Sequence, residues 1–171
     1  MAEKVLADST EVRQLIGFTV GNEEYGLELL KVREVIRPRQ VTWLPNAPSC
    51  VKGIINLRGQ VIPIIDLRDR FGLPPAEDTA MTRVIVVEIE GRPVGMVVDS
   101  ASQVVRVPVD QFDEPPPAIG EAARSFISAV GKIEDRLVTL MDVEKLLSLE
   151  EMRRIERTLS AKRREPAMDR A

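Results

Sequence analysis

The sequence predicts a mainly β fold made of small barrels, with only a few short helices. Three observations predict this fold class: short stretches in which apolar and polar residues alternate, glycine-containing turns between those stretches, and an internal repeat. Strands this short leave open sheet edges unless the sheet closes on itself, and closure into a barrel removes those edges.

The strand pairs are predicted by alternation and by the turns that join them. The stretches QLIGFTV (14–20) and RVIVVEI (83–89) alternate as half-buried strands do. The turns GNEE (21–24) and EGRP (90–93) each offer a glycine for a positive φ angle. A last strand pair is predicted within residues 126–142.

Short helices are predicted where capping residues stand. Asp66 suits the N-cap of a helix in DLRDRFGL, and Gly72 suits its end. Asp142 suits the N-cap of a second short helix, VEKLL. The stretch NAPSCVKG (46–53) is predicted as a loop, because prolines at its start exclude a central strand.

An internal repeat supports two related modules. Residues 15–36 match 84–105 at an offset of 69, and residues 60–67 match 136–143 at an offset of 76. The proline-rich insertion 113–119 absorbs the difference. Any two β-hairpins look alike, but two matches in the same order favour a duplication. We therefore predict two β modules, at about 12–75 and 80–145.

The C-terminal segment 148–165 is predicted as a helix. Ser148 and Glu151 have the spacing of a capping box. The apolar residues Leu149, Met152, Ile155 and Leu159 fall on one narrow stripe. Such a stripe packs on its own domain or binds a partner, and the sequence leaves both open. Residues 1–11 and 166–171 are expected to be disordered.

Composition narrows the function classes. The 171 residues carry a net charge of −3, one cysteine and no histidine. The charge argues against nucleic-acid binding, the missing histidine excludes Ser-His-Asp and Cys-His catalysis, and a lone cysteine excludes a cysteine-rich zinc site. We expect no catalytic residues, no cofactor and no metal, although the many carboxylates leave a carboxylate enzyme open. Cys50 and Trp43 are expected in the core.

The stretch GIINLRGQVIPIIDLR (53–68) places an arginine within an apolar run. NLRG fits a type I turn followed by a glycine bulge, which puts Arg58 at a hairpin tip. Pro63 lacks an N–H, so its strand is predicted to be an edge strand or a bulged one. Arg58 is then either an ordinary solvent-exposed arginine or a residue that contacts a partner protein. The same two interpretations apply to the Glu34 carboxylate.

A family resemblance rests on these same residues. YGLELLKVREVI, followed by LPNAPSCVKGIINLRGQVIPIIDLRDRFGL, resembles the chemotaxis coupling proteins of the CheW family, and VGMVVDSASQVVRV is similar to their second half. The resemblance covers residues 12–147, as one CheW-like domain. It implies two five-stranded SH3-like barrels with a hydrophobic groove between them. It also places the family's receptor-contacting residues on Val32, Glu34 and Arg58.

The resemblance implies a non-enzymatic adaptor. Its partners would be the cytoplasmic hairpin tip of chemoreceptors and the regulatory domain of the chemotaxis histidine kinase, with no nucleic acid and no insertion into the membrane. We expect a cytoplasmic protein recruited to membrane-bound receptor arrays, because no stretch reads as a secretory signal or a membrane span. Other readings remain open: an adaptor for surface motility or a similar receptor–kinase pathway, a detached kinase regulatory domain, or a small-molecule sensor using the groove.

Overall fold

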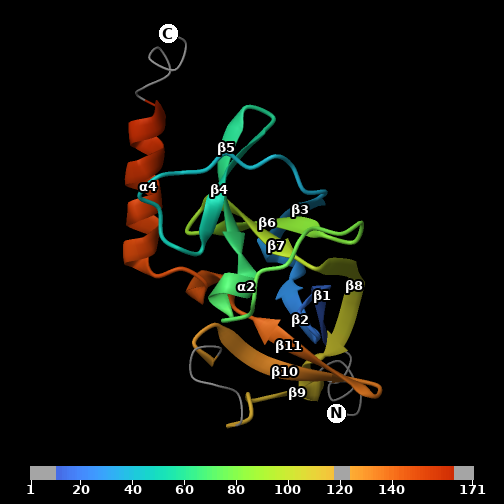
Figure 1. Ribbon diagram of the computed structural model, residues 1–171. Coiled ribbons are helices and arrows are strands. Elements are labelled where there is room, and N and C mark those ends of the chain that lie inside the picture. The colour runs from blue at the N-terminus through green and yellow to red at the C-terminus, as the bar shows by residue number, and fades with distance from the viewer. Residues whose placement is uncertain (1–10, 118–123, 164–171) are drawn as a thin grey trace.

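Two β-sheets make up most of the protein, which is seen here as a computed structural model describing residues 11–117 and 124–163. Sheet A has the strand order β8-β1-β2-β11-β10-β9, and sheet B has the order β3-β6-β7-β5-β4. Sheet B lies above sheet A in Figure 1, with α4 standing along one side. The strands are β1 (Val12–Val20), β2 (Glu23–Glu28), β3 (Val32–Ile36), β4 (Val51–Leu57), β5 (Gln60–Asp66), β6 (Arg83–Ile89), β7 (Arg92–Val98), β8 (Ser100–Pro108), β9 (Phe112–Asp113), β10 (Ile127–Ile133) and β11 (Arg136–Met141).

The predicted fold class is confirmed: the protein is mainly β, with two SH3-like β domains and few helices. Sheet A gains a sixth strand, β9, which is only two residues long. The helical elements are η1 (Leu29–Lys31), α2 (Leu67–Arg70), η2 (Val109–Gln111), η3 (Val143–Lys145) and α4 (Leu149–Arg163). Within the described ranges, no helix is both long enough and apolar enough to cross a membrane.

The two sheets do not follow the two halves of the sequence. Sheet A joins β1 and β2 to strands of the second half, and sheet B joins β6 and β7 to strands of the first half. The modules predicted at 12–75 and 80–145 therefore need correction, because each half contributes its first hairpin to the sheet of the other half. This exchange couples the two domains through the chain itself.

The internal repeat is visible in the strand register. In sheet A, β11 runs parallel to β2, with Gly26 opposite Leu140. In sheet B, β5 runs parallel to β7, with Gly95 opposite Ile64. The repeat offset of 69 relates Gly26 to Gly95, and the offset of 76 relates Ile64 to Leu140. Both sheets therefore contain the same parallel pairing. A Cβ atom added to Gly26 would lie 2.9 Å from the Leu15 side chain. One added to Gly95 would lie 2.7 Å from the Ile64 side chain.

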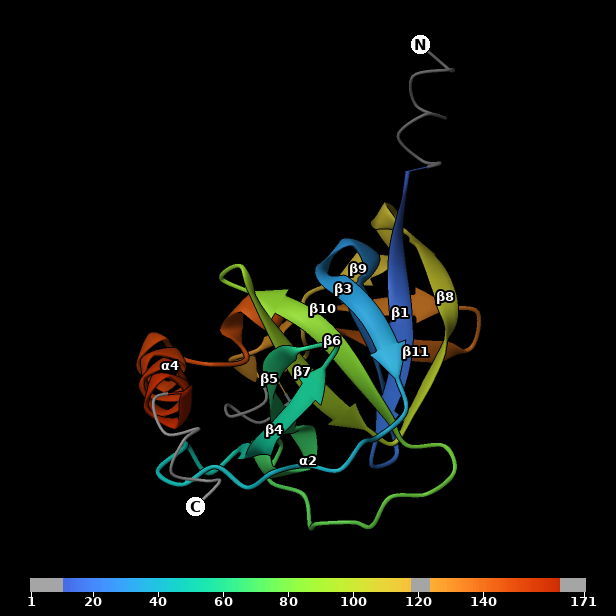
Figure 2. The same cartoon turned by 90° about the horizontal axis from the view of Figure 1, so that it is seen from above.

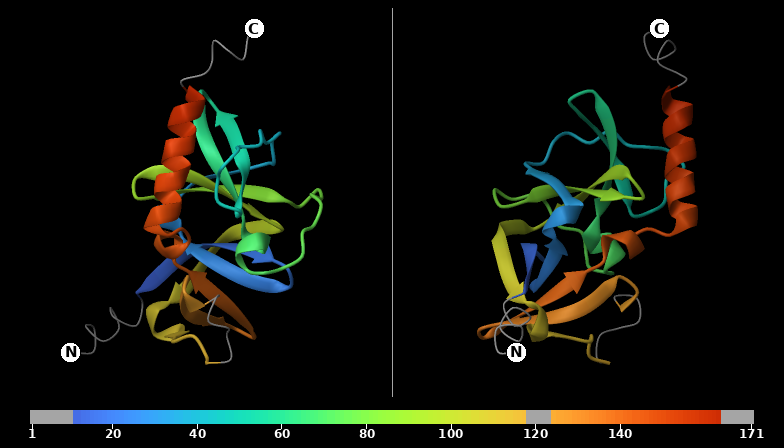
Figure 3. Two further views of the ribbon diagram at one scale, coloured as in Figure 1. Left: turned by 60° about the vertical axis from the view of Figure 1, so that its left-hand side comes forward. Right: turned by 180° about the vertical axis from the view of Figure 1, so that it is seen from behind.

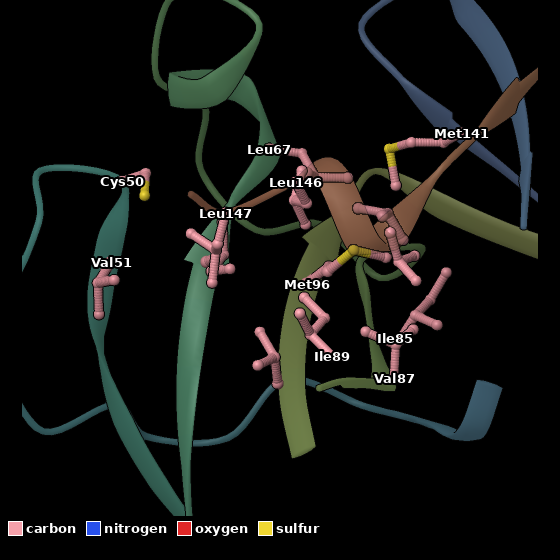
Figure 4. Packing of buried hydrophobic residues seen from close by; sticks show 14 of the residues in the cluster. Cys50, Val51, Leu67, Ile85, Val87, Ile89, Met96, Met141, Leu146 and Leu147 are labelled. Carbon is pink, nitrogen blue, oxygen red and sulfur yellow. The ribbon is translucent and has the colours of Figure 1, made fainter. Parts of the chain in front are cut away.

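One hydrophobic core is shared between the sheets. Buried residues of sheet A, including Phe18 and Met141, belong to the same cluster as Ile85 and Met96 of sheet B. Figure 4 shows Met141 and Leu146 beside the sheet B residues of this cluster. Because the cluster spans both sheets, burial of its apolar surface holds the two domains together.

The C-terminal helix α4 packs on its own chain. Its residues Met152, Ile155 and Leu159 are buried in the shared core cluster, and α4 lies beside sheet B in both views of Figure 3. Seen end-on in Figure 2, α4 stands next to β4 and β5. This observation favours the first of the two roles left open by the sequence. Leu149, placed on the same stripe, is 61% exposed.

The predicted helix caps are confirmed. Asp66 accepts a hydrogen bond from the Arg68 N–H at 3.0 Å, and Asp142 accepts one from the Glu144 N–H at 3.0 Å. The Ser148 N–H donates to Glu151 at 2.9 Å, and the Glu151 N–H donates to Ser148 Oγ at 3.1 Å. These two bonds are the reciprocal pair of a capping box.

The expectation that Pro63 lies on an edge strand or a bulged strand is wrong: β5 is an interior strand between β7 and β4, and the bulge in the β4–β5 pairing has its extra residue on β4. Pro63 is tolerated there for two reasons. The pairing with β7 begins one residue later, at Ile64. On the β4 side, Pro63 lies opposite Ile54, whose N–H and C=O both bond to Thr42 instead. No ladder hydrogen bond from Pro63 is required.

The expected terminal disorder falls almost entirely outside the described residues, as does part of the 113–119 insertion. Glu11 is described, and its carbonyl accepts a hydrogen bond from the Val109 N–H at 3.0 Å. For the helix predicted over 148–165, the structure gives Leu149–Arg163, with Ser148 as the capping residue.

Candidate functional site

The β4–β5 hairpin ends in a two-residue turn that carries Arg58. Leu57 pairs with Gln60, so only Arg58 and Gly59 lie in the turn. Their φ angles are +53° and +85°, which is the pattern of a type I′ turn. The predicted type I turn with a glycine bulge is therefore wrong. Asn56 nevertheless bonds the turning backbone as expected, accepting a hydrogen bond from the Gly59 N–H at 2.8 Å.

The structure brings Glu34 and Arg58 together. Glu34 lies on β3, the edge strand next to β6, and its carboxylate forms an ion pair with the Arg58 guanidinium. The Arg58 side chain is 67% exposed and that of Glu34 is 31% exposed. An exposed pair of this kind contributes about 0–1 kcal/mol to stability. Its position at the rim of sheet B leaves both groups within reach of a partner.

Three further residues extend this polar cluster and were not singled out from the sequence. The Arg33 guanidinium donates to Gln60 Oε1 at 3.3 Å and lies 3.0 Å from the Glu88 carboxylate. Arg33, Glu34, Leu57, Arg58 and Gln60 together line an open hollow. The sequence does not show which strands lie beside Arg33 and Glu34, because the pattern of one strand does not reveal its neighbours in a sheet.

Val32, the third predicted residue, lies in an apolar environment. It starts β3, pairs with Val87 of β6, and packs half-buried against the shared core cluster. A register shift between Val32 and Glu34 separates the two along the strand. The three residues therefore lie along one edge strand and its neighbouring turn, with an apolar end at Val32 and a charged end at Glu34 and Arg58.

The apolar end continues toward sheet A. Leu30, in η1 between β2 and β3, is 96% exposed. Next to it, Lys31 donates to Glu144 at 2.9 Å, and this hydrogen bond raises the pKa of Lys31. Lys31 also lines a second hollow, whose buried floor includes Leu27, Leu140 and Met141. No pattern in the sequence indicates that Leu30, rather than Leu29, faces solvent.

Residues 11–117 and 124–163 contain no group of three or more His, Cys, Asp or Glu side chains that could hold a metal ion. Cys50 is buried as expected, and burial raises the pKa of its thiol, which keeps the thiol neutral and unreactive.

Comparison with known proteins gives a consistent result. The model of the CheW-like domain family matches residues 14–151. The protein of Klebsiella aerogenes named Chemotaxis protein CheW is 41% identical over 147 residues, covering 86% of this chain and 89% of the relative. Protein PilI of Pseudomonas aeruginosa is 34% identical over 115 residues, covering 67% and 65%.

A solved structure shares the fold. The crystal structure of the scaffolding protein TtCheW from Thermoanaerobacter tengcongensis matches with a TM-score of 0.75 and 31% sequence identity. The match covers 82% of this chain and 96% of that one. The family model, the relatives and the strand arrangement agree, and the chain therefore belongs to the CheW-like domain family.

Proposed function

We propose that the protein is a non-enzymatic adaptor that couples chemoreceptors to a CheA-type histidine kinase in chemotaxis. Family membership supports this role, since relatives from Klebsiella aerogenes and Helicobacter pylori are both named chemotaxis proteins. The alternatives, a small-molecule sensor or an adaptor of another receptor–kinase pathway, are not favoured by these relatives. The partners would be the cytoplasmic hairpin tip of a receptor and the regulatory domain of the kinase. The adaptor would act in the cytoplasm, at membrane-bound receptor arrays.

The observation that carries the proposal is the Glu34–Arg58 ion pair at the rim of sheet B. An amphipathic receptor helix presents an apolar stripe flanked by charges. Along β3 and η1, the exposed Leu30 and half-buried Val32 offer apolar contact, and the ion pair lies at the other end. Apolar contact then supplies affinity, while the two charges select the partner and its register.

Binding of the full-length protein to a receptor cytoplasmic fragment tests the assignment. Arg58→Ala and Glu34→Lys are each expected to weaken binding by about tenfold, the effect of losing one interface contact worth about 1.4 kcal/mol. Both variants are expected to retain the fold, because an exposed ion pair contributes at most about 1 kcal/mol.

Arg92→Ala is the matched control. Arg92 forms a similar exposed ion pair with Glu156 of α4, on another part of sheet B. Binding by this variant is expected to equal that of the unmodified protein. Equal binding by the Arg58 and Arg92 variants, or unfolding of either site variant, would show that Glu34 and Arg58 are not the receptor contacts.

A further inference from the structure

The segment between β3 and β4 presents a tryptophan to solvent from a fixed backbone. Trp43 is 73% exposed, so the expectation that it belongs to the core is wrong. Its neighbours are held in place: Thr42 exchanges two hydrogen bonds of 2.8 Å with Ile54, and Leu44 is buried. The exposure of Trp43 is therefore built into the backbone path rather than produced by a loose loop.

Two further contacts fix this segment. Gly53 of β4 has a φ of +153°, and a Cβ atom there would lie 2.2 Å from the Thr42 carbonyl oxygen, so glycine permits the close approach. On the other side of Trp43, the Arg154 guanidinium of α4 donates to the Asn46 carbonyl at 3.2 Å. Because the backbone around Trp43 is already ordered, binding of a partner there requires little further ordering of the backbone.

An open hollow lies on the same edge of sheet B. Thr42 pairs with Ile54 of β4, and the residues before Thr42 diverge from β4. The β3–β4 segment and β4 therefore line the hollow from two sides. Its lining is partly apolar, with the buried residues Ile54 and Ile55, and partly polar, with Asn56 and Arg39 at its margin. The hollow has room for an apolar side chain beside polar backbone and cationic groups.

The stretch from the end of β3 to β5 is strongly positive. Residues 35–65 contain four cationic side chains and no carboxylate, although the whole chain has a net charge of −3. Arg37, Arg39 and Lys52 are exposed, and none of them forms an ion pair or a side-chain hydrogen bond with the described residues. Arg58, in contrast, is already paired with Glu34. The β3–β4 segment and β4 therefore carry three cations that lack a counter-charge within the described residues.

We propose that the surface formed by Arg39, Trp43 and Lys52, with Arg37 where the chain leaves β3, binds an acidic segment of a partner protein. Carboxylates of the partner would pair with the three cations, and an apolar side chain would lie against Trp43. Tryptophan and arginine are the residue types that dominate protein interfaces. The apolar lining of the hollow favours a protein over nucleic acid, which the acidic chain repels overall. The surface does not include Glu34 or Arg58, and it adds a second contact to the proposed adaptor.

Photo-crosslinking from position 43 of the full-length protein in living cells tests the proposal. Trp43 is replaced by p-benzoylphenylalanine, and the crosslinked products are identified by mass spectrometry. Leu137 of β11, which is 59% exposed on sheet A, receives the same group as a position control. The expected product from position 43 is a protein segment rich in Asp and Glu, at a higher yield than from position 137.

Charge reversal supplies the second arm. Arg37→Glu with Arg39→Glu is expected to lower the yield from position 43 by about fivefold or more. Arg106→Glu, an exposed arginine on β8 of sheet A, is expected to leave that yield unchanged. The proposal is overturned by equal yields at positions 43 and 137, by products of nucleic acid or lipid, by a protein segment without acidic residues, or by a yield that the double variant leaves unchanged.

Discussion

Replacing Asp99 with asparagine is expected to loosen the connection between the two sheets. Asp99 lies where the chain leaves β7 of sheet B and enters β8 of sheet A. Its carboxylate accepts hydrogen bonds from Arg68 Nε at 3.2 Å and Arg68 Nη2 at 2.6 Å, and from the Gly21 N–H at 2.8 Å. The Asp99 carboxylate therefore connects α2 and the β1–β2 turn to the segment that crosses between the sheets.

The expected loss can be bounded from the burial of the pair. Removing one partner of a fully buried ion pair costs about 3–5 kcal/mol, while an exposed pair contributes about 0–1 kcal/mol. The Arg68 and Asp99 side chains are 21% and 33% exposed, between these limits. Asp99→Asn keeps the shape but removes the charge, so we expect a loss of about 2 kcal/mol. In a domain of this size, that loss lowers the Tm by about 4–8 °C.

Chemical denaturation with a matched control checks this value. Asp113 pairs with Lys132 at 3.2 Å, with both side chains about 60% exposed, so Asp113→Asn removes the same charge from an open site. Its expected loss is below about 0.5 kcal/mol. Equal losses for the two variants, or a loss below about 0.5 kcal/mol for Asp99→Asn, would refute the claim that Asp99 links the sheets.

Two more predictions concern the β4 edge and α4. Gly53→Ala is expected to lower the free energy of unfolding by about 2 kcal/mol or more in a denaturation titration. The added Cβ would collide with the Thr42 carbonyl oxygen, and the φ of Gly53 disfavours side chains. An unchanged denaturation midpoint would contradict this prediction. Burial alone would raise the pKa of Glu151, but hydrogen bonds from Arg70 and Ser148 hold it below the ordinary glutamate value. A lowered pKa contributes stability that is present above about pH 4.3 and is lost as the pH falls through the folded-state pKa. Glu151→Gln is therefore expected to flatten this acid-side loss in pH-dependent melting, and an unchanged pH profile would count against the assigned role.

Local features of the fold could be predicted from the sequence. The hairpins at Gly21 and Gly91, the caps at Asp66 and Asp142 and the capping box at Ser148 all depend on residues close together in the chain. Their geometry follows from local hydrogen bonding and from the freedom of glycine at positive φ. The repeat was also detectable, because the duplicated strands keep their apolar spacing.

Features that depend on distant residues could not be predicted in this way. The exchange of hairpins between the halves is fixed by parallel pairing of β5 with β7 and of β11 with β2, and alternation does not reveal a partner strand. Trp43 reads as core by composition, yet the bridge from Thr42 to Ile54 turns it to solvent. The pairing of Glu34 with Arg58 likewise depends on which strands lie next to the hairpin tip.

Reconstituted signalling complexes test the central claim most directly. Kinase activity is measured with receptor and kinase in membranes, with the full-length protein added as unmodified chain, as Arg58→Ala or as Arg92→Ala. An adaptor that couples through the Glu34–Arg58 edge predicts receptor-dependent kinase activity with the unmodified and Arg92→Ala proteins and its loss with Arg58→Ala. Equal kinase activity with the Arg58→Ala and Arg92→Ala proteins, or the same activity without any added protein, would contradict the account.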